Sequence, residues 1–365
     1  MLDIALKLLC EFTSRSYKAY IVGGFVRDHI LGIESNDIDI TTNATPKEIK
    51  EIFEDSFLPS EDYGSVTVMW KGVRFEITTF RKEIEYYNNR KPVEIKYVDD
   101  LMTDLLRRDF TINTLCMDSD GNILDYLGGR KDIDNRIINT VGDANDKFAE
   151  DSLRMLRAIR FATILNFNLS EDVKKAILNK KYLLKKLSYF RKKTELEKIF
   201  ISPNRNDGVK LLLELGLDED LELPKLRELN ANDTCSLIGI WSFLNVADKY
   251  PFNKNELELI KEINCVYKLN NFDPHVLYKY GLYVNSVVGE MKGLDIKKIT
   301  EAYAKLSIHS SSDIDIDSNT IMNILHKKPG KYLSAIYEDL ENKILYNKLK
   351  NDNKTICNYI IENYK

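Results

Sequence analysis

The sequence predicts an α+β protein in which a mixed N-terminal part precedes an all-helical remainder. Short runs rich in Val, Ile, Thr and aromatic residues, which are typical of strands, are mixed with helical segments up to about residue 140. From the segment AEDSLRMLRAIRFATILNF onward, Leu, Ile, Lys and Glu recur at helical spacing to the C-terminus. We therefore predict a head at residues 1–138, a helical neck at 139–200, and a helical body and tail at 201–365.

The composition is that of a globular protein without an overall attraction to nucleic acid. The 365 residues are 44% hydrophobic and 30% charged, and the net charge is −4, so a polyanion site requires local clusters of Lys and Arg. The five cysteines are far apart and form no C-x-x-C motif, which argues against a disulfide framework or a zinc site. No apolar run is long enough to span a bilayer, and we expect a cytoplasmic protein.

The head begins with elements that the local pattern defines. MLDIALKLLCEF has the apolar spacing of an amphipathic helix, and AYIVG is a short apolar run typical of a buried strand. FVRDHIL is predicted to be a helix that ends at Gly32, because glycine favours the left-handed C-cap conformation. DIDIT alternates acidic and apolar residues, which predicts a strand with one charged face.

Further along the head, SVTVMWKGVRFEITTF predicts two strands joined by a Lys-Gly turn. RKEIEYYNNRKPVEIKYV is polar and contains a proline, so we expect a mobile loop followed by another strand. In the helical part, breaks at SPNRNDG, LELPKL, DKYPFNKN and HKKPGKY predict the junctions between helices.

Asp37 and Asp39 form a D-x-D pattern within the predicted strand. Residues two apart on a strand point to the same face, so the two carboxylates would lie side by side, with Ile38 and Ile40 buried behind them. Adjacent carboxylates repel each other unless a cation lies between them, and Mg²⁺ is often held by one or two carboxylates together with substrate phosphates. On its own, such a tripeptide is more often a solvated strand face.

Gly23 and Gly24 follow a predicted strand and open a predicted helix. Without a Cβ they allow backbone N–H groups to approach a ligand, and a helix N-terminus favours phosphate. Arg27, about one turn into that helix, could add a charge-assisted contact to a phosphate oxygen. The pattern is neither G-x-G-x-x-G nor a P-loop, and a glycine pair alone is usually a turn. Its value as a signal comes from the D-x-D strand that follows closely.

Together, VGGFVRDHILG and NDIDITT resemble the first motif of the class II tRNA nucleotidyltransferases and bacterial poly(A) polymerases, within the superfamily of DNA polymerase β. LLRRDFTINTL, DYLGGRKDIDNRIINTVG and EDSLRMLRAIRFATILNF follow in the order of that family, so the similarity covers about residues 19 to 170. A fainter similarity returns in KKPGKYLSAIYEDLENKILYNKL. The resemblance implies a polymerase-β-like nucleotidyltransferase head followed by an elongated all-helical neck, body and tail.

The resemblance also implies a reaction, the template-independent addition of C, C and A to the 3′ end of tRNA from CTP and ATP. Asp37 and Asp39 would bind two Mg²⁺ ions, one activating the terminal 3′-hydroxyl and the other stabilising the leaving pyrophosphate. Gly23, Gly24 and Arg27 would hold the triphosphate. We expect tRNA, CTP and ATP as partners, and neither DNA nor a membrane.

Two further segments carry residues that the resemblance implicates. Glu76 in RFEITTF has the type required of a third carboxylate, although a strand salt bridge explains it at least as well. In RRDFTIN, Arg108 would contact the nucleotide phosphates, and Asp109 and Asn113 would lie near the ribose. The alternative for RRDFTIN is a structural Arg-Asp pair at a helix start. DYLGGRKDIDNR looks like a structural link without chemistry.

Asp151 and Arg154 in EDSLRMLRAIRF are three residues apart, with Arg157 and Arg160 continuing at the same spacing, so we expect them on one helix face. Most such runs are solvated, ion-paired faces, but the apolar neighbours leave this helix little free surface. By resemblance, Asp151 and Arg154 would read the base, and Arg157 and Arg160 would support the nucleotide or the readers.

The chemistry of the bases fits this pair. Cytosine and adenine both present an amino donor beside a ring-nitrogen acceptor, so a carboxylate and a guanidinium recognise either base. Uracil and guanine present the reverse order and would leave a buried charge unpaired, at a cost of roughly 1–3 kcal/mol or more. Side chains would thus replace a template strand.

LNKKYLLKKLSYFRKKTELEKIF is rich in basic residues that could neutralise tRNA phosphates, although for any one lysine a solvated helix face explains the charge equally well. The residues predicted to contact RNA are Lys185, Lys186, Arg191 and Lys192. The family pattern S-x-E-R-I-x-x-E-L, which is thought to brace the neck, appears here as SYFRKKTEL. It keeps Ser188, Arg191 and Glu195 but has Phe190 and Lys192 at the Glu and Ile positions.

Two alternatives to CCA addition stay open. One is a poly(A) polymerase or an A-adding enzyme of the same family, and the other is a catalytically inactive RNA-binding module. The acidic balance and short tail disfavour the first, and the intact acidic and Asp-Arg pairs disfavour the second. The loop EIEYYNNRKP has the length expected of members that add the final A, whereas members that add only CC have a shorter loop.

Overall fold

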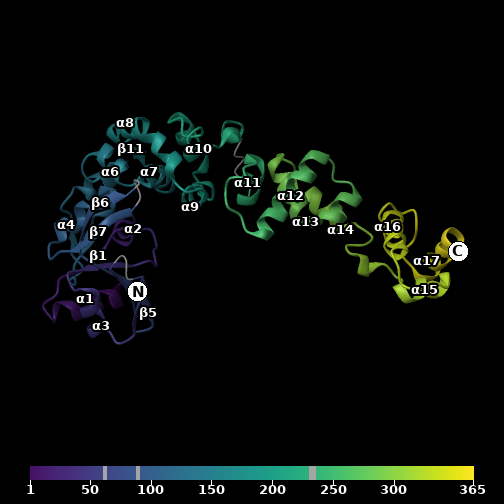
Figure 1. Cartoon of the computed structure of the whole chain (residues 1–365), viewed down its shortest axis with the longest axis horizontal. Helices are drawn as coiled ribbons and strands as arrows, with labels where there is room; N and C mark the ends of the chain where they lie inside the picture. Colours follow the sequence, from purple (N-terminus) through teal and green to yellow (C-terminus); the bar gives the residue numbers. More distant parts are fainter. Residues whose placement is uncertain (61–63, 88–90, 230–235) are drawn as a thin grey trace. The chain divides into compact units, whose positions relative to one another are not determined.

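The computed structural model describes residues 1–60, 64–87, 91–229 and 236–365. It divides into two compact units, Met1–Arg227 and Glu228–Lys365 (Figure 1). This division falls inside the segment predicted to be body and tail, so the boundaries at residues 138 and 200 stay predictions. The mixed head and the helical remainder are confirmed.

A sheet of seven described strands lies at the centre of the first unit, in the order β3-β4-β5-β2-β1-β8-β9. The strands are β1 (Ala19–Val22), β2 (Asp39–Thr42), β3 (Ser56–Ser60), β4 (Ser65–Trp70), β5 (Val73–Thr79), β8 (Cys116–Met117) and β9 (Ile123–Leu124). Neighbouring strands are antiparallel except for β2 and β5, which are parallel. Lys71 and Gly72 both have positive φ between β4 and β5, as expected of a two-residue hairpin turn, which confirms the predicted Lys-Gly turn.

Helices in this part of the chain pack their apolar residues against the sheet and its connections. They are α1 (Leu2–Thr13), α2 (Gly24–Leu31), α3 (Pro46–Ile52) and α4 (Leu101–Leu106). Phe12 of α1 meets Phe53 edge to face, and Leu101 and Leu105 of α4 join a buried cluster with residues of β1 and β8. α2 ends at Gly32 with φ 69°, which confirms the predicted C-cap.

A β-hairpin occupies the segment predicted to be a loop, which corrects that prediction. β6 (Arg81–Tyr87) pairs antiparallel with β7 (Lys91–Tyr97), and the connection at residues 88–90 lies outside the described residues. KEIEY alternates charged residues with Ile and Tyr, which is the periodicity of a strand. The high charge of the segment made it resemble a loop. Pro92 is compatible with this hairpin, since both strands of a two-stranded sheet are edge strands.

The rest of the first unit is mainly helical. Its elements are η2 (Thr111–Asn113), α5 (Gly129–Asp134), β10 (Ile137–Ile138), α6 (Ala144–Glu150), α7 (Leu153–Leu165), β11 (Asn168–Leu169), α8 (Glu171–Lys180), η3 (Lys181–Lys186), α9 (Tyr189–Phe200) and α10 (Arg205–Glu214), and η4 (Pro224–Glu228) includes the last residues of the unit and Glu228 after them. β10 and β11 form a short parallel pair. α7 packs against α9 and α10, and α10 comes so close that a Cβ at Gly208 would lie 2.5 Å from Thr163 Oγ1.

The second unit consists of helices and their connections in its described residues. They are α11 (Leu237–Leu244), α12 (Lys254–Leu269), α13 (Pro274–Met291), α14 (Ile296–Ala304), η5 (Ser311–Asp313), α15 (Ser318–Leu325), α16 (Tyr332–Leu345) and α17 (Asn353–Tyr364). One buried cluster includes Ile263 and Val288, and another includes Ile321, Leu340 and Ile360. The predicted helix junctions are confirmed. None of the helices in the described ranges is long and apolar enough to cross a membrane.

Candidate active site

The glycine turn between β1 and α2 forms one wall of the candidate site. Gly23 precedes α2 with φ 84° and ψ −133°, a conformation that glycine adopts at low cost. An added Cβ at Gly23 would lie 3.6 Å from Arg108 Nη1, and one at Gly24 would lie 3.6 Å from Arg27 Nη2. The N-terminus of α2 is therefore flanked by two guanidinium groups, a combination that suits phosphate.

The register of the sheet sets Asp39 beside this turn and Glu76 beside Asp39. Asp39 lies opposite Val22, the residue before Gly23, in the antiparallel pair of β1 and β2. On its other side Asp39 lies opposite Glu76 in the parallel pair of β2 and β5. Residues that are far apart in the sequence thus meet on three adjacent strands.

Asp37 does not lie on the strand with Asp39, which corrects the prediction. β2 begins at Asp39, because its partner β1 ends at Val22 and the chain turns away at Gly23, so earlier residues have no strand to pair with. Asp37 is exposed, whereas Ile38 is buried as expected. Asp37 is nevertheless near enough to Asp39 for the two carboxylates to repel each other, although only Asp39 belongs to the strand.

The carboxylate of Asp39 is destabilised by its surroundings, although the residue as a whole is exposed. Loss of hydration, then repulsion by Asp37 and by Glu76, raise the pKa of Asp39 to about 6, while the guanidinium of Arg108 acts in the opposite direction. A divalent cation would relieve this repulsion, and carboxylate oxygens are ligands that Mg²⁺ prefers. No three His, Cys, Asp or Glu side chains in the described part of the chain converge as a metal site. A bound cation would reduce the repulsion among Asp37, Asp39 and Glu76.

Asp104, which the sequence pattern did not lead us to select, fixes the arginine beside the glycine turn. It is fully buried in α4 and pairs with Arg107 at 2.7 Å and with Arg108 at 3.2 Å. Burial raises the pKa of Asp104, but the two guanidinium groups outweigh burial and hold that pKa below its usual value. The i,i+3 and i,i+4 spacing in DLLRR was the signal available in the sequence.

Asn113 and Asp109 connect Arg27 of α2 with Arg157 of α7. Asn113 Oδ1 accepts a hydrogen bond from Arg27 Nη1 at 2.7 Å, and Asn113 Nδ2 donates to Asp109 Oδ1 at 3.2 Å. Asp109 Oδ2 accepts from Arg157 Nε at 2.7 Å. Burial raises the pKa of Asp109, but Arg157 and the hydrogen bonds outweigh burial and lower it to about 2. These four predicted site residues are brought together, and their contact with a nucleotide stays a prediction.

Asp151 and Arg154 do not share a helix face, contrary to the prediction. The chain leaves the helical conformation at Asp151 (φ −138°, ψ 107°), the residue after the end of α6, and Arg154 lies in the first turn of α7. Arg154 is buried, pairs with Glu150, and donates from Nη2 to the main-chain oxygen of Arg107 at 3.0 Å. Asp151 accepts instead from Arg191 Nη2 at 2.9 Å.

Residues kept from the neck motif hold α7 and α9 together. The Ser188 side chain caps α9, accepting from the main-chain N–H of Arg191, and Arg191 pairs with Asp151. Glu195 lies 3.3 Å from Arg160, and both side chains are buried. These contacts agree with a bracing role for the motif.

Lys192 is buried, which contradicts its prediction as an RNA contact. Its side chain is 1% exposed, and its ammonium lies 4.7 Å from the centre of the Tyr189 ring. The sequence already indicated burial, because Lys192 stands at the position where the family motif has an apolar Ile. Lys185 and Lys186 are exposed, and Lys185 lies 3.5 Å from Asp220.

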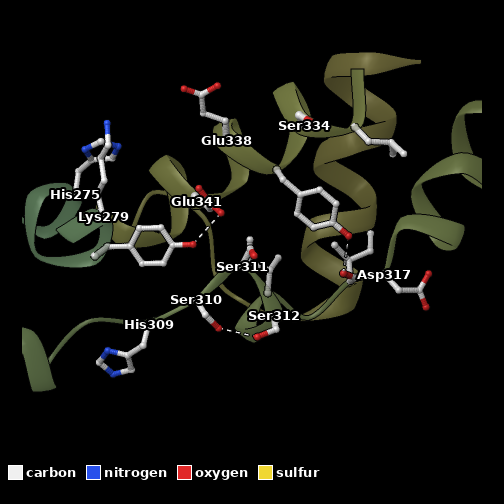
Figure 2. A pocket seen from close by; sticks show the side chains of 15 residues that line it. His275, Lys279, His309, Ser310, Ser311, Ser312, Asp317, Ser334, Glu338 and Glu341 are labelled. Atoms are coloured by element: carbon white, nitrogen blue, oxygen red, sulfur yellow. Dashed lines mark hydrogen bonds between the residues drawn. The ribbon is translucent and has the colours of Figure 1, made fainter. Parts of the chain in front are cut away.

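The second unit contains a cavity of about 1100 Å³ that the sequence did not predict (Figure 2). Residues of α13, of α16 and of the segment 309–317 line it. The Tyr278 hydroxyl of α13 donates to Glu341 Oε1 of α16 at 2.8 Å, and burial together with this contact raises the pKa of Tyr278. Figure 2 marks a hydrogen bond to Glu341 with a dashed line and labels His275 and Lys279, which belong to α13 as Tyr278 does. The bond ties α13 to α16, and the lining residues are separate from those predicted for the site.

Three family models match the chain. The Poly A polymerase head domain matches residues 19–139, and the model described as "Probable RNA and SrmB-binding site of polymerase A" matches residues 166–226. A model of tRNA nucleotidyltransferase domain 2 matches residues 252–360. The first model covers the glycine turn, the acids and the Arg108 segment.

Curated proteins and solved structures are similar over almost the whole chain. The CCA-adding enzyme of Geobacillus sp. (strain WCH70) is 33% identical, covering 98% of this chain and 96% of that protein. The CCA-adding enzyme of Bacillus subtilis (strain 168) is 32% identical, with 96% of each covered. The crystal structure of the Bacillus stearothermophilus CCA-adding enzyme in complex with CTP matches with a TM-score of 0.86 at 27% identity, over 98% of this chain and 96% of that one. The Thermotoga maritima CCA-adding enzyme complexed with tRNA shares the fold, with a TM-score of 0.71 at 20% identity over 99% and 95%.

Proposed function

The chain belongs to the family of CCA-adding enzymes, the tRNA nucleotidyltransferases, and on this basis we propose that it adds C, C and A in turn to the 3′ end of tRNA. CTP and ATP are the proposed substrates, and pyrophosphate is the product released. One observation carries the proposal: the sheet register sets Asp39 beside both Glu76 and the glycine turn.

Asp37 and Asp39 are the proposed ligands of Mg²⁺, with Glu76 as a third candidate. When bound, Mg²⁺ supplies Lewis-acid activation of the 3′-hydroxyl and charge stabilisation for the leaving pyrophosphate. The protein holds the carboxylates of Asp37, Asp39 and Glu76 close enough for their negative charges to repel one another. Binding of a cation would reduce this repulsion and is therefore favoured. Arg27 and Arg108 stand beside the N–H groups of the turn, where they would neutralise the triphosphate.

Asp151 and Arg154 are the proposed base readers, and both already have partners within the protein. Arg191 holds Asp151, while Glu150 and main-chain oxygens hold Arg154. Cytosine or adenine would give Asp151 an amino donor and Arg154 a ring-nitrogen acceptor in place of these partners. Uracil or guanine would offer the wrong order and would leave both charges without a partner.

The exposed residues Lys185, Lys186 and the partly exposed Arg191 support a contact with tRNA phosphates. The affinity of the protein for tRNA should therefore fall as the salt concentration rises. The head, neck, and body with tail keep the boundaries 1–138, 139–200 and 201–365 in this proposal, and the protein would act in the cytoplasm.

Three tRNA transcripts, ending before, within and after the CC sequence, test the proposal with each labelled nucleotide and Mg²⁺. We expect C, C and then A to be added, followed by arrest, and no addition of U or G. Long A tails would instead indicate a poly(A) polymerase, and addition of A alone an A-adding enzyme. No incorporation from any transcript by a folded preparation would contradict nucleotide transfer altogether.

A further inference from the structure

Three arginines of the candidate site surround one aromatic ring. The guanidinium carbon of Arg160 lies 4.3 Å from the centre of the Phe161 ring, that of Arg27 lies 5.2 Å away and that of Arg157 lies 5.5 Å away. Arg27 comes from α2, whereas the other two come from α7. Phe161 is thus a point at which the glycine-turn helix and the neck helix meet.

Like charges so close together repel each other. Burial, and then repulsion by Arg157 and by Arg27, lower the pKa of Arg160, while Glu195 acts against this. The negative face of an aromatic ring offsets part of such repulsion, because it attracts each guanidinium. The ring is itself fixed, since Phe161 meets the fully buried Phe110 edge to face with 5.7 Å between ring centres.

Hydrogen bonds hold the three arginines unequally. Arg27 donates to Asp28 and Asn113, and Arg157 donates to Asp109. Arg160 Nε and Glu195 Oε2 form an ion pair at 3.3 Å, yet neither atom makes a hydrogen bond within the described part of the chain. The orientation of Arg160 therefore depends more on the ring than that of its neighbours does.

We infer that Phe161 is a positioning residue, which holds Arg27, Arg157 and Arg160 in the orientation that binds the incoming nucleotide. The inference rests on the proposed function. Phe161 acts through the arginines and not on the reacting atoms, so its loss should weaken the binding of CTP and ATP alike. The chemical step and the binding of tRNA should change little.

Phe161→Leu and Phe161→Met keep an apolar side chain without an aromatic face, while Phe161→Tyr keeps the ring. We expect KM for CTP and for ATP to rise about tenfold in the Leu and Met variants. We expect kcat and KM for tRNA to stay within about threefold of the unchanged protein, and Phe161→Tyr to retain near-normal values throughout. Phe190→Leu is the matched control, since Phe190 is 68% exposed, and it should leave all constants unchanged.

Direct binding of CTP without tRNA, measured by calorimetry, separates this inference from the proposed function. If the wild-type protein binds CTP but transfers no nucleotide, the proposed function is refuted. The inference about Phe161 is tested separately, by the difference in CTP affinity between the wild type and the variants. Unchanged CTP affinity in Phe161→Leu, or a folded Phe161→Tyr as weak as Phe161→Leu, would overturn the inference. If the Leu and Met variants do not fold, Phe161→Tyr and Phe161→Trp test the inference instead. Both variants keep an aromatic ring and should bind CTP as the wild type does, and a loss of CTP affinity in either folded variant would overturn the inference.

Discussion

Asp39 and Asp109 are two acids of one site whose surroundings shift their pKa values in opposite directions. Lost hydration and two neighbouring acids raise the pKa of Asp39 to about 6. Arg157 and hydrogen bonds outweigh the burial of Asp109 and lower its pKa to about 2. When two acids of one site have pKa values shifted in opposite directions, the two acids can take different roles. Asp109 is a fixed charge that orients Arg157, whereas the repulsion at Asp39 is of the kind that an added cation would reduce.

Replacing Asp39 by Asn should slow nucleotide incorporation by at least about 100-fold, because a charge that stabilises the transition state is lost. The folded pKa of Asp39 is raised, so its contribution to stability is favourable at low pH and is lost as pH rises through about 6. At pH 8 without divalent ions, the variant should therefore melt at a higher temperature than the wild type. Mg²⁺ should raise the melting temperature of the wild type alone.

Asp120→Asn, a change to an exposed acid, is the control for this substitution and should alter neither rate nor melting temperature. Full-speed incorporation by folded Asp39→Asn protein would refute the role proposed for Asp39.

Replacing Asp109 by Asn should destabilise the protein by on the order of 2 kcal/mol at pH 7, because the lowered pKa of Asp109 is a stabilising contribution. For an acid with a lowered folded pKa, this stability is present above the unfolded value. It is lost as pH falls through the folded value of about 2. Urea unfolding at pH 7, 5 and 3 should show a constant difference at the first two values and a smaller one at pH 3. A difference that grows on acidification would contradict this account.

The elements of the fold were predictable where one local rule governs them. The strand at Ala19–Val22, the Lys-Gly turn and the C-cap at Gly32 follow from apolar runs and from glycine. The hairpin β6–β7 was missed because charged residues hide its alternation. The end of α6 was missed because Asp151 leaves the helix without a glycine or proline to signal the break.

Site residues were predictable by type and not by contact. The sequence singled out Asp39 and Arg108, and the structure sets Asp39 opposite Val22 and Arg108 beside Gly23. It could not show that the strand starts only at Asp39, since this depends on where β1 ends. Burial of Lys192 and Asp104 also depends on tertiary packing.

The packing of α10 on α7 and α9 depends on Gly208. An added Cβ would lie 2.5 Å from Thr163 Oγ1 and 2.7 Å from Ile199 Cγ2. Gly208→Ala should therefore destabilise the protein by about 1–3 kcal/mol, because overlap in a packed interface outweighs the roughly 1 kcal/mol gained from helix propensity. Lys210→Ala on the exposed face of α10 should change stability by less than about 0.5 kcal/mol. Urea denaturation measures both, and a stabilised Gly208→Ala protein would contradict the packing described.

At the scale of the whole molecule, the candidate site lies entirely within the first compact unit. Every residue proposed for nucleotide or metal binding falls in Met1–Arg227, whereas the helices after it form hydrophobic clusters of their own. Nucleotide binding and stable retention of tRNA should therefore be separable.

A fragment of residues 1–227 should fold and bind CTP within about threefold of the affinity of the full chain, since its core and site are complete. Its affinity for tRNA should fall at least about tenfold, because we expect the body and tail to bind tRNA in addition to Lys185, Lys186 and Arg191, which the fragment keeps. Calorimetry with CTP and filter binding with labelled tRNA measure the two quantities. A folded fragment that no longer binds CTP, or that binds tRNA as well as the full chain, would contradict the separation of nucleotide binding from tRNA retention.

The pairing of Val22 with Asp39 has a consequence for how such proteins vary and how they are recognised. Cross-strand hydrogen bonds set the distance between the turn and Asp39, while residues 33–36, between α2 and the D-x-D tripeptide, form neither helix nor strand. Insertions or deletions in residues 33–36 would leave the pairing of Val22 with Asp39 intact. A search pattern for distant relatives should therefore keep the glycine pair and the D-x-D tripeptide and allow a gap of any length between them.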